Sequence, residues 1–179
     1  MAHELELVNG HAQMVWHGKK PWHGLGKEVS NDLTPEEMLR EAGLDWLVEK
    51  QDVVLASNHN IVLENKALVR SSDQSVLTMT GPNWNPVQNH EAFEFFNDFV
   101  MSGNMEMNTA GSLRGGKMVW ALAKVKSSFR IFLNDEVEGY LLFSNPHQFG
   151  KCIEIRFTPV RTVCWNTLTY AIATESSNS

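Results

Sequence analysis

The sequence predicts an α+β fold, in which antiparallel β-sheets pack against a few helices. Two regions, residues 46–80 and 105–158, consist of short apolar runs separated by turn-forming residues, a pattern typical of antiparallel strands. Segments with the apolar spacing of helices lie before, between and after these regions. Hydrophobic residues make up 42% of the 179-residue chain, which is enough to form the core of one domain.

The chain divides into an N-terminal arm at residues 1–30, a single α+β domain at 31–174 and a flexible tail at 175–179. The arm is rich in Gly, His and Trp and shows no regular apolar spacing, which indicates an ordered arm or loop. It contains no basic start followed by an apolar run, so we do not expect a signal peptide. No segment approaches the length of a membrane-spanning helix.

The first helix is predicted at residues 35–42, where the sequence carries both a start and a stop signal. Thr34 suits the N-cap, Pro35 suits the first helical position, and Glu37 completes a capping box. Gly43 is expected to end the helix in the left-handed conformation.

Residues 46–80 are predicted to form a meander of short strands, broken at 58–60, 64–66 and 72–74. A second helix is predicted at 89–104, with an aromatic stripe that faces the core. Strands follow again, with a Gly-Gly turn before the second of them and a last strand that alternates apolar and charged residues. A helix predicted at 161–173 closes the fold.

The charge of the chain is distributed unevenly. The net charge is −6, which weighs against strong non-specific binding to DNA or to an anionic membrane. However, the region 111–165 contains eight Lys and Arg residues against four Asp and Glu residues. We therefore expect a polyanion to contact the C-terminal half of the protein.

Basic residues interleaved with aromatic residues predict a single-stranded nucleic-acid site. The predicted phosphate contacts are Arg114, Lys117, Arg130, Arg156 and Arg161, with Trp165 as a stacking platform. A second candidate group near the N-terminus is Lys19, Lys20 and Lys27 with Trp16 and Trp22. The alternative interpretation is a solvated strand face above a tryptophan core.

Two Trp-His-Gly triplets stand six residues apart, at 16–18 and 22–24. We expect Trp22 to pack against the helix at 35–42, His23 to form a hydrogen bond across the turn, and Lys19 and Lys20 to stay exposed. The alternative role is a contact between subunits. The predicted structural residues are Pro21, Trp22, His23, Gly24, Gly26 and, in the last helix, Asn166.

No catalytic constellation is expected, so an enzyme is the less favoured class. His11, His17 and His23 are spaced too loosely for a typical zinc site, and we predict no metal and no cofactor. The run GSLRGGK leads into a strand, whereas a phosphate-binding loop opens a helix. Cys164 has no histidine near it in sequence to act as a base.

Four motifs give the chain a resemblance to a known family. They are MAHELE at the start, PWHGLG at 21–26, LTPEEMLREAGLDW at 33–46 and RTVCWNTL at 161–168. Together they resemble the phage/plasmid-like protein family that carries the domain of unknown function 932. Members typically continue beyond the last motif with a further helical section, so the resemblance implies a short or a truncated member.

The resemblance implies a role in the DNA metabolism of phages, plasmids and integrated elements. With the basic region, it favours a protein that binds single-stranded DNA in recombination or annealing without ATP, as phage annealing proteins do. Since those proteins form rings or filaments, we expect a homo-oligomer in the cytoplasm of a bacterial host, without membrane association. The alternative, favoured by the net acidity, is an interaction module that binds a host protein and no nucleic acid.

Overall fold

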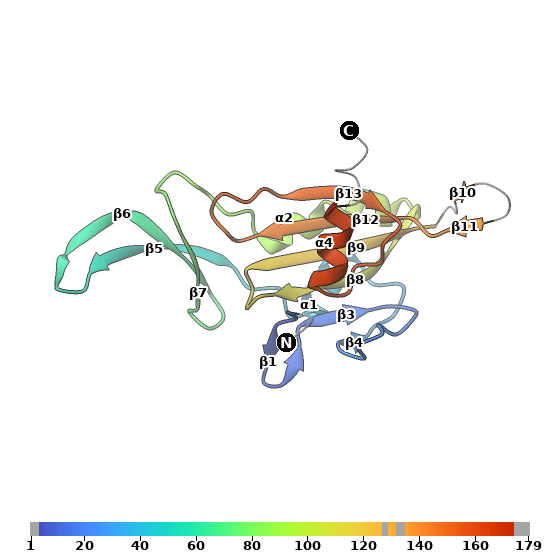
Figure 1. The fold of residues 1–179 in the computed structure, drawn as a ribbon, viewed down its shortest axis with the longest axis horizontal. Helices are drawn as coiled ribbons and strands as arrows, with labels where there is room; N and C mark the ends of the chain where they lie inside the picture. The colour runs from blue at the N-terminus through green and yellow to red at the C-terminus, as the bar shows by residue number, and fades with distance from the viewer. Residues whose placement is uncertain (1–3, 127–128, 132–134, 174–179) are drawn as a thin grey trace.

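The computed structural model describes residues 4–126, 129–131 and 135–173, and it confirms the α+β fold (Figure 1). A six-stranded sheet with the order β13-β12-β9-β8-β3-β4 forms the centre. Its strands are β3 (Met14–Trp16), β4 (Lys27–Glu28), β8 (Met105–Leu113), β9 (Met118–Val125), β12 (Tyr140–Pro146) and β13 (Glu154–Thr158). All neighbours are antiparallel except β3 and β4, which are parallel.

Helices cover both faces of the central sheet (Figure 1). They are α1 (Pro35–Glu41), α2 (Asn89–Glu94), α3 (Asn97–Met101) and α4 (Trp165–Ala173). The alternating side chains of β9 lie in two separate cores, one on each face of the sheet. Ala121 faces the core beneath α1, α2 and α3, whereas Trp120 and Leu122 face the core beneath α4. The inner strands β8, β9 and β12 are therefore buried on both sides.

A second sheet confirms the predicted meander. It consists of β5 (Val48–Leu55), β6 (Asn58–Arg70) and β7 (Val76–Thr80), paired antiparallel in that order. The predicted breaks at 58–60 and 64–66 are wrong, since β6 begins at Asn58 and runs through both; the turn after β5 lies at 56–57. Asp52 pairs with Lys66 and Val53 with Leu63, so the two extra residues of β6 form a bulge rather than a turn.

Two further pairs of short strands lie outside these sheets. They are β1 (Leu7–Val8) with β2 (His11–Ala12), and β10 (Phe129–Ile131) with β11 (Asp135–Val137). Strand β3 lies within the segment predicted as an arm, yet it is a buried strand of the central sheet. Its three apolar residues are too few to show a period in the sequence.

The first helix is confirmed, with the capping box of Thr34 and Glu37 formed as expected. The single helix predicted at 89–104 is wrong, because α2 and α3 are separate. The N–H of Phe96 bonds to the carbonyl oxygen of Phe93, three residues earlier, and this tighter turn brings both rings into the core.

A buried arginine joins the second sheet to the central one. Arg70 pairs with the buried Glu6, and its Nη2 lies 2.6 Å from a carboxylate oxygen of Asp73. Ser112 of β8 donates to the other Glu6 oxygen over 2.6 Å. The hydrogen bonds from Arg70 hold the pKa of Asp73 well below its usual value.

Candidate nucleic-acid interface

The doubled Trp-His-Gly motif forms the connection between β3 and β4, which we call the WHG loop (residues 16–26). The N–H of Gly24 donates to the carbonyl oxygen of Pro21 over 2.9 Å and closes a turn. Gly26 has a φ of +88°, and a Cβ there would lie 2.9 Å from the carbonyl oxygen of Met14. Glycine is therefore required at 26 both by its backbone conformation and by the close approach of β3.

The first triplet is bonded to strand β8. The N–H of His17 donates to the carbonyl oxygen of Asn108 over 2.8 Å, and the Asn108 amide donates back to the His17 carbonyl oxygen over 3.4 Å. Trp16 lies in the core beneath α4. The start of the loop is therefore an extension of the sheet.

Arg161 joins the WHG loop to the segment that precedes α4. Its Nε donates to the side-chain oxygen of Asn108 over 2.7 Å, and its Nη2 to the carbonyl oxygen of His17 over 2.7 Å. Its Nη1 donates to the carbonyl oxygen of Lys19. Three of the five N–H groups of the guanidinium thus bind protein oxygens. Burial lowers the pKa of Arg161 below its ordinary value, yet a guanidinium keeps its charge.

The second triplet is joined to the same segment through His23. Its Nδ1 accepts the N–H of Leu25 over 3.1 Å, so Nε2 carries the proton that it donates to the carbonyl oxygen of Val163, 3.0 Å away. The predicted hydrogen bond across the turn is confirmed. The bond to Val163 is an additional one, between residues 140 positions apart.

The side chain of Trp22 is 71% exposed, so the prediction that it packs against the helix at 35–42 is wrong. The buried Pro21 and the bonded His23 on either side hold the loop and leave the indole outside. The His23 ring contacts the indole edge-on, with centroids 5.4 Å apart. Lys19 and Lys20 are exposed, as expected.

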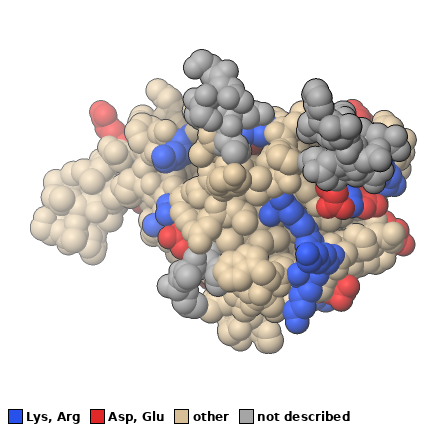
Figure 2. Space-filling view, turned by 45° about the vertical axis from the view of Figure 1, so that its right-hand side comes forward, with Lys and Arg blue, Asp and Glu red and all other residues tan. Residues whose placement is uncertain are grey.

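Figure 2 shows a run of Lys and Arg side chains on the side of the molecule that carries the WHG loop. Arg161 bonds to the backbone oxygen of Lys19, which directly precedes Lys20 in the chain, and the Lys20 side chain lies beside Gly24, 3.7 Å from where its Cβ would be. A cavity of about 150 Å³ opens beside Lys19 and Arg161, and its lining also includes Tyr140 and two carboxylates, those of Glu106 and Glu138. Burial raises the pKa of Tyr140.

The structure brings two of the predicted site residues together elsewhere. The guanidinium carbon of Arg114 lies 3.6 Å from the ring centroid of Trp165, a cation–π contact, and Arg114 also pairs with Glu4. Trp165 is half-buried, and this contact covers one side of its ring.

The other predicted phosphate contacts lie apart from one another. Lys117 is half-buried beside the β8–β9 turn. Arg156 donates to the carbonyl oxygen of Ile172 over 2.7 Å and lies 3.3 Å from Glu154. The side chain of Arg130 lies outside the described residues. Their role as phosphate contacts stays a prediction.

Asn166 is exposed in the first turn of α4, and the cap of this helix depends on its neighbour Thr167. The Thr167 hydroxyl oxygen accepts the N–H groups of Val163 and Cys164 over 2.9 and 3.0 Å. These bonds fix the residues to which His23 is joined. The closing helix was predicted from 161, and this start is wrong: α4 begins at Trp165, because residues 161–164 bond to the WHG loop.

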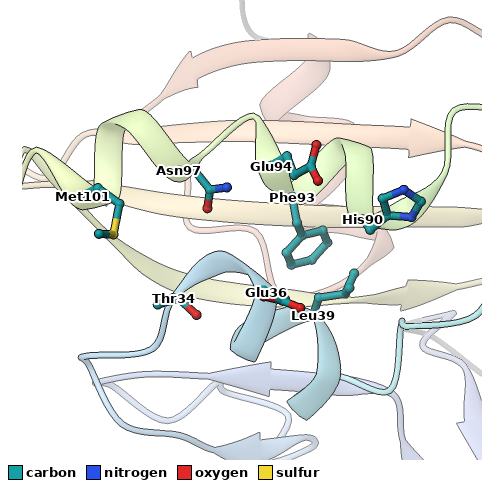
Figure 3. A pocket seen from close by; sticks show the side chains of 8 residues that line it. All are labelled: Thr34, Glu36, Leu39, His90, Phe93, Glu94, Asn97 and Met101. Carbon is teal, nitrogen blue, oxygen red and sulfur yellow. The ribbon is translucent and has the colours of Figure 1, made fainter.

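A larger cavity, of about 660 Å³, lies between α1 and the α2–α3 pair (Figure 3). Leu39 and Phe93 contribute apolar surface, whereas Glu36 and Glu94 add negative charge that disfavours a phosphate ligand. Within the described ranges, no group of three His, Cys, Asp or Glu residues is placed to hold a metal ion. None of the described helices is long and apolar enough to cross a membrane.

A comparison with known families decides the affiliation of the chain. The model of a domain of unknown function (DUF932) matches residues 76–179. The chain belongs to the DUF932 family. No curated protein and no solved structure matches it. The DUF932 match includes β8 and α4, and thus Asn108 and Arg161, whereas the WHG loop precedes the matched region.

Proposed function

We propose that this DUF932 protein binds single-stranded DNA at the WHG loop, in the DNA metabolism of a mobile element in the cytoplasm of a bacterial host. Trp22 carries the proposal, because its exposed indole lies in one short loop with the exposed Lys19 and Lys20. Single-strand binding proteins combine aromatic side chains, on which bases stack, with basic residues that follow the phosphate backbone.

The loop is held in place before any ligand arrives. Arg161 bonds to two of its carbonyl oxygens, and His23 bonds to Val163 at the other end. A binding loop that is already ordered loses less conformational entropy on binding. In this proposal Arg161 and His23 are positioning residues, Trp22 stacks on a base, and the two lysines contact phosphates.

The proposal predicts modest affinity with a shallow salt dependence. Stacking on one indole contributes about 1–3 kcal/mol per base. Two phosphate contacts on a single strand give a slope of log K against log salt of about −1.4. The net charge of −6 opposes binding elsewhere on the surface, which confines DNA to the basic run in Figure 2.

The test is the fluorescence anisotropy of labelled oligo-dT with the full chain at several salt concentrations. Trp22→Ala is expected to weaken binding by about five- to a hundredfold, the range that corresponds to one stacked base, and Trp22→Phe to retain most of it. Lys19→Gln with Lys20→Gln is expected to weaken binding and flatten the salt slope. DNA should also quench the emission of Trp22.

Two control variants match these changes. Met101→Ala removes an equally exposed apolar side chain, and Lys50→Gln with Lys126→Gln removes two exposed charges outside the loop. Both should bind oligo-dT like the unmodified chain. If affinity follows Arg114→Gln with Lys117→Gln instead, and not the loop variants, the site lies at Trp165. Absence of binding at low salt would overturn the proposed function.

A further inference from the structure

The hairpin of β5 and β6 extends away from the central sheet and its helices (Figure 1). Its distal part, residues 53–63, which we call the hairpin tip, contains no Lys, Arg, Asp or Glu. The projecting end of the molecule is accordingly free of charged surface in Figure 2. Soluble proteins usually protect exposed strands with charges, and here the first charged residues are Asp52 and Glu64, at the two ends of the tip.

Both faces of the hairpin tip expose aliphatic side chains. Val54 pairs with Val62 on one face, and Val53 pairs with Leu63 on the other. The exposed ones are Val54, Leu55, Ile61, Val62 and Leu63. Exposed aliphatic side chains gathered at one end of a molecule are typical of an interaction site.

A second exposed apolar surface lies on β13, which forms one edge of the central sheet. Phe157 is 60% exposed, and Ile155 is also exposed. Both lie on the face of the sheet whose inner strands are covered by α2 and α3. Ile155 lies across from Phe143, whose ring is 5.5 Å from that of Phe95. We call Ile155 and Phe157 the β13 surface. Among the described strands β13 pairs only with β12, and such an edge can accept a further strand.

We propose that the hairpin tip of one copy docks on the β13 surface of a second copy. Beside the two surfaces, Asp52 is paired with Lys66 and Glu154 with Arg156, so those charges offset each other. The exposed Glu64, directly after the tip, and the exposed Lys151, shortly before β13, have opposite charges and make the two surfaces complementary. Contact between two tips would instead bring two Glu64 carboxylates together. The tip points away from its own central sheet (Figure 1), so the contact is between molecules.

This interface joins two different surfaces and is therefore head-to-tail. Each copy keeps one free tip and one free β13 surface, so the assembly extends into a chain or closes into a ring. The tip has fewer residues than the 20–30 a side of a standard interface. We therefore expect association that depends on protein concentration and reverses on dilution.

The experiment uses sedimentation velocity with the full chain over a range of concentrations. Val62→Lys places a charge on the tip, and Phe157→Lys places one on β13. Each variant is expected to be monomeric, with association weakened at least about thirtyfold, as for a central interface residue. An equimolar mixture of the two should form a 1:1 heterodimer and nothing larger, because only one tip and one β13 surface remain competent.

Met101→Lys is the matched control, since Met101 is exposed and lies on α3; it should assemble like the unmodified chain. Circular dichroism verifies that every variant is folded, which we expect because the substituted side chains are exposed. Three outcomes would overturn the proposal. They are a monomeric unmodified chain at all concentrations, normal assembly of Phe157→Lys, and a mixture that stays monomeric.

Discussion

The guanidinium of Arg161 donates to the carbonyl oxygen of His17 over 2.7 Å, although 144 residues separate them in the chain. Through this bond the WHG loop and the start of α4 form one unit. Asn108 of β8 completes it, since its side-chain oxygen also accepts from Arg161. The position of Trp22 and the lysines therefore depends on a residue that contributes no base contact.

Arg161→Lys tests this dependence, because it keeps the charge but loses the planar set of donors. The free energy of unfolding should fall by roughly 1.5–3 kcal/mol, the usual contribution of a hydrogen bond to a charged group, since the Arg161 bonds are at most part-buried. The affinity for oligo-dT should fall as well. Urea denaturation and anisotropy measure the two effects, with the exposed Arg40→Lys as control. Lower stability with unchanged affinity would show that DNA binding does not need the ordered loop.

Arg70→Met is expected to destabilise the fold strongly, by about 3–5 kcal/mol, because it leaves the buried Glu6 without its cation. Adding Glu6→Leu removes the unpaired charge and should restore part of the loss. Urea denaturation of the two single variants and the double variant forms a double-mutant cycle. Additive effects would show that Arg70 and Glu6 act independently.

The sequence predicted those elements whose start and end depend on residues close together in the chain. The helix α1 was predicted because Thr34, Glu37 and Gly43 act within a few residues of one another. The break between α2 and α3 was missed, since it depends on fitting both Phe93 and Phe96 into a core formed by distant strands.

The candidate site was harder to predict for the same reason. Arg161 was selected as a phosphate contact by its charge, whereas its carbonyl partners are contributed by a loop more than 140 residues away. The sequence did not indicate a role for Asn108, because it is one polar residue in an alternating strand. Trp22 was expected to pack on the helix at 35–42, which follows it closely in the chain, and only the tertiary fold shows that Pro21 and His23 hold the loop instead.

Gly26→Ala should destabilise the protein more than Gly18→Ala, although both glycines have a φ above +80° in the same loop. The left-handed backbone costs about 1–2 kcal/mol with alanine at either position. A Cβ at 26 also meets the Met14 carbonyl oxygen at 2.9 Å, whereas a Cβ at 18 has no atom within 4 Å. Thermal unfolding compares the two, and equal losses would contradict the close approach of β3.

His147 should make the fold less stable in mild acid. It is fully buried, its Nε2 lies 2.8 Å from the side-chain oxygen of Asn89, and burial lowers its pKa to about 4. The unfolded chain, in which a histidine has a pKa near 6.5, therefore binds more protons between these two values. As the pH falls through this window, the free energy of unfolding should decrease by up to roughly 3 kcal/mol.

The control for this prediction is His147→Gln, which keeps an amide donor for Asn89 but does not titrate. Urea denaturation of both proteins from pH 7 to pH 4 separates the contribution of His147 from that of all other groups, which titrate equally in the two. The unmodified chain should lose stability faster than the variant as the pH falls. Parallel curves would mean that His147 is protonated as readily in the folded state as in the unfolded one, against its complete burial.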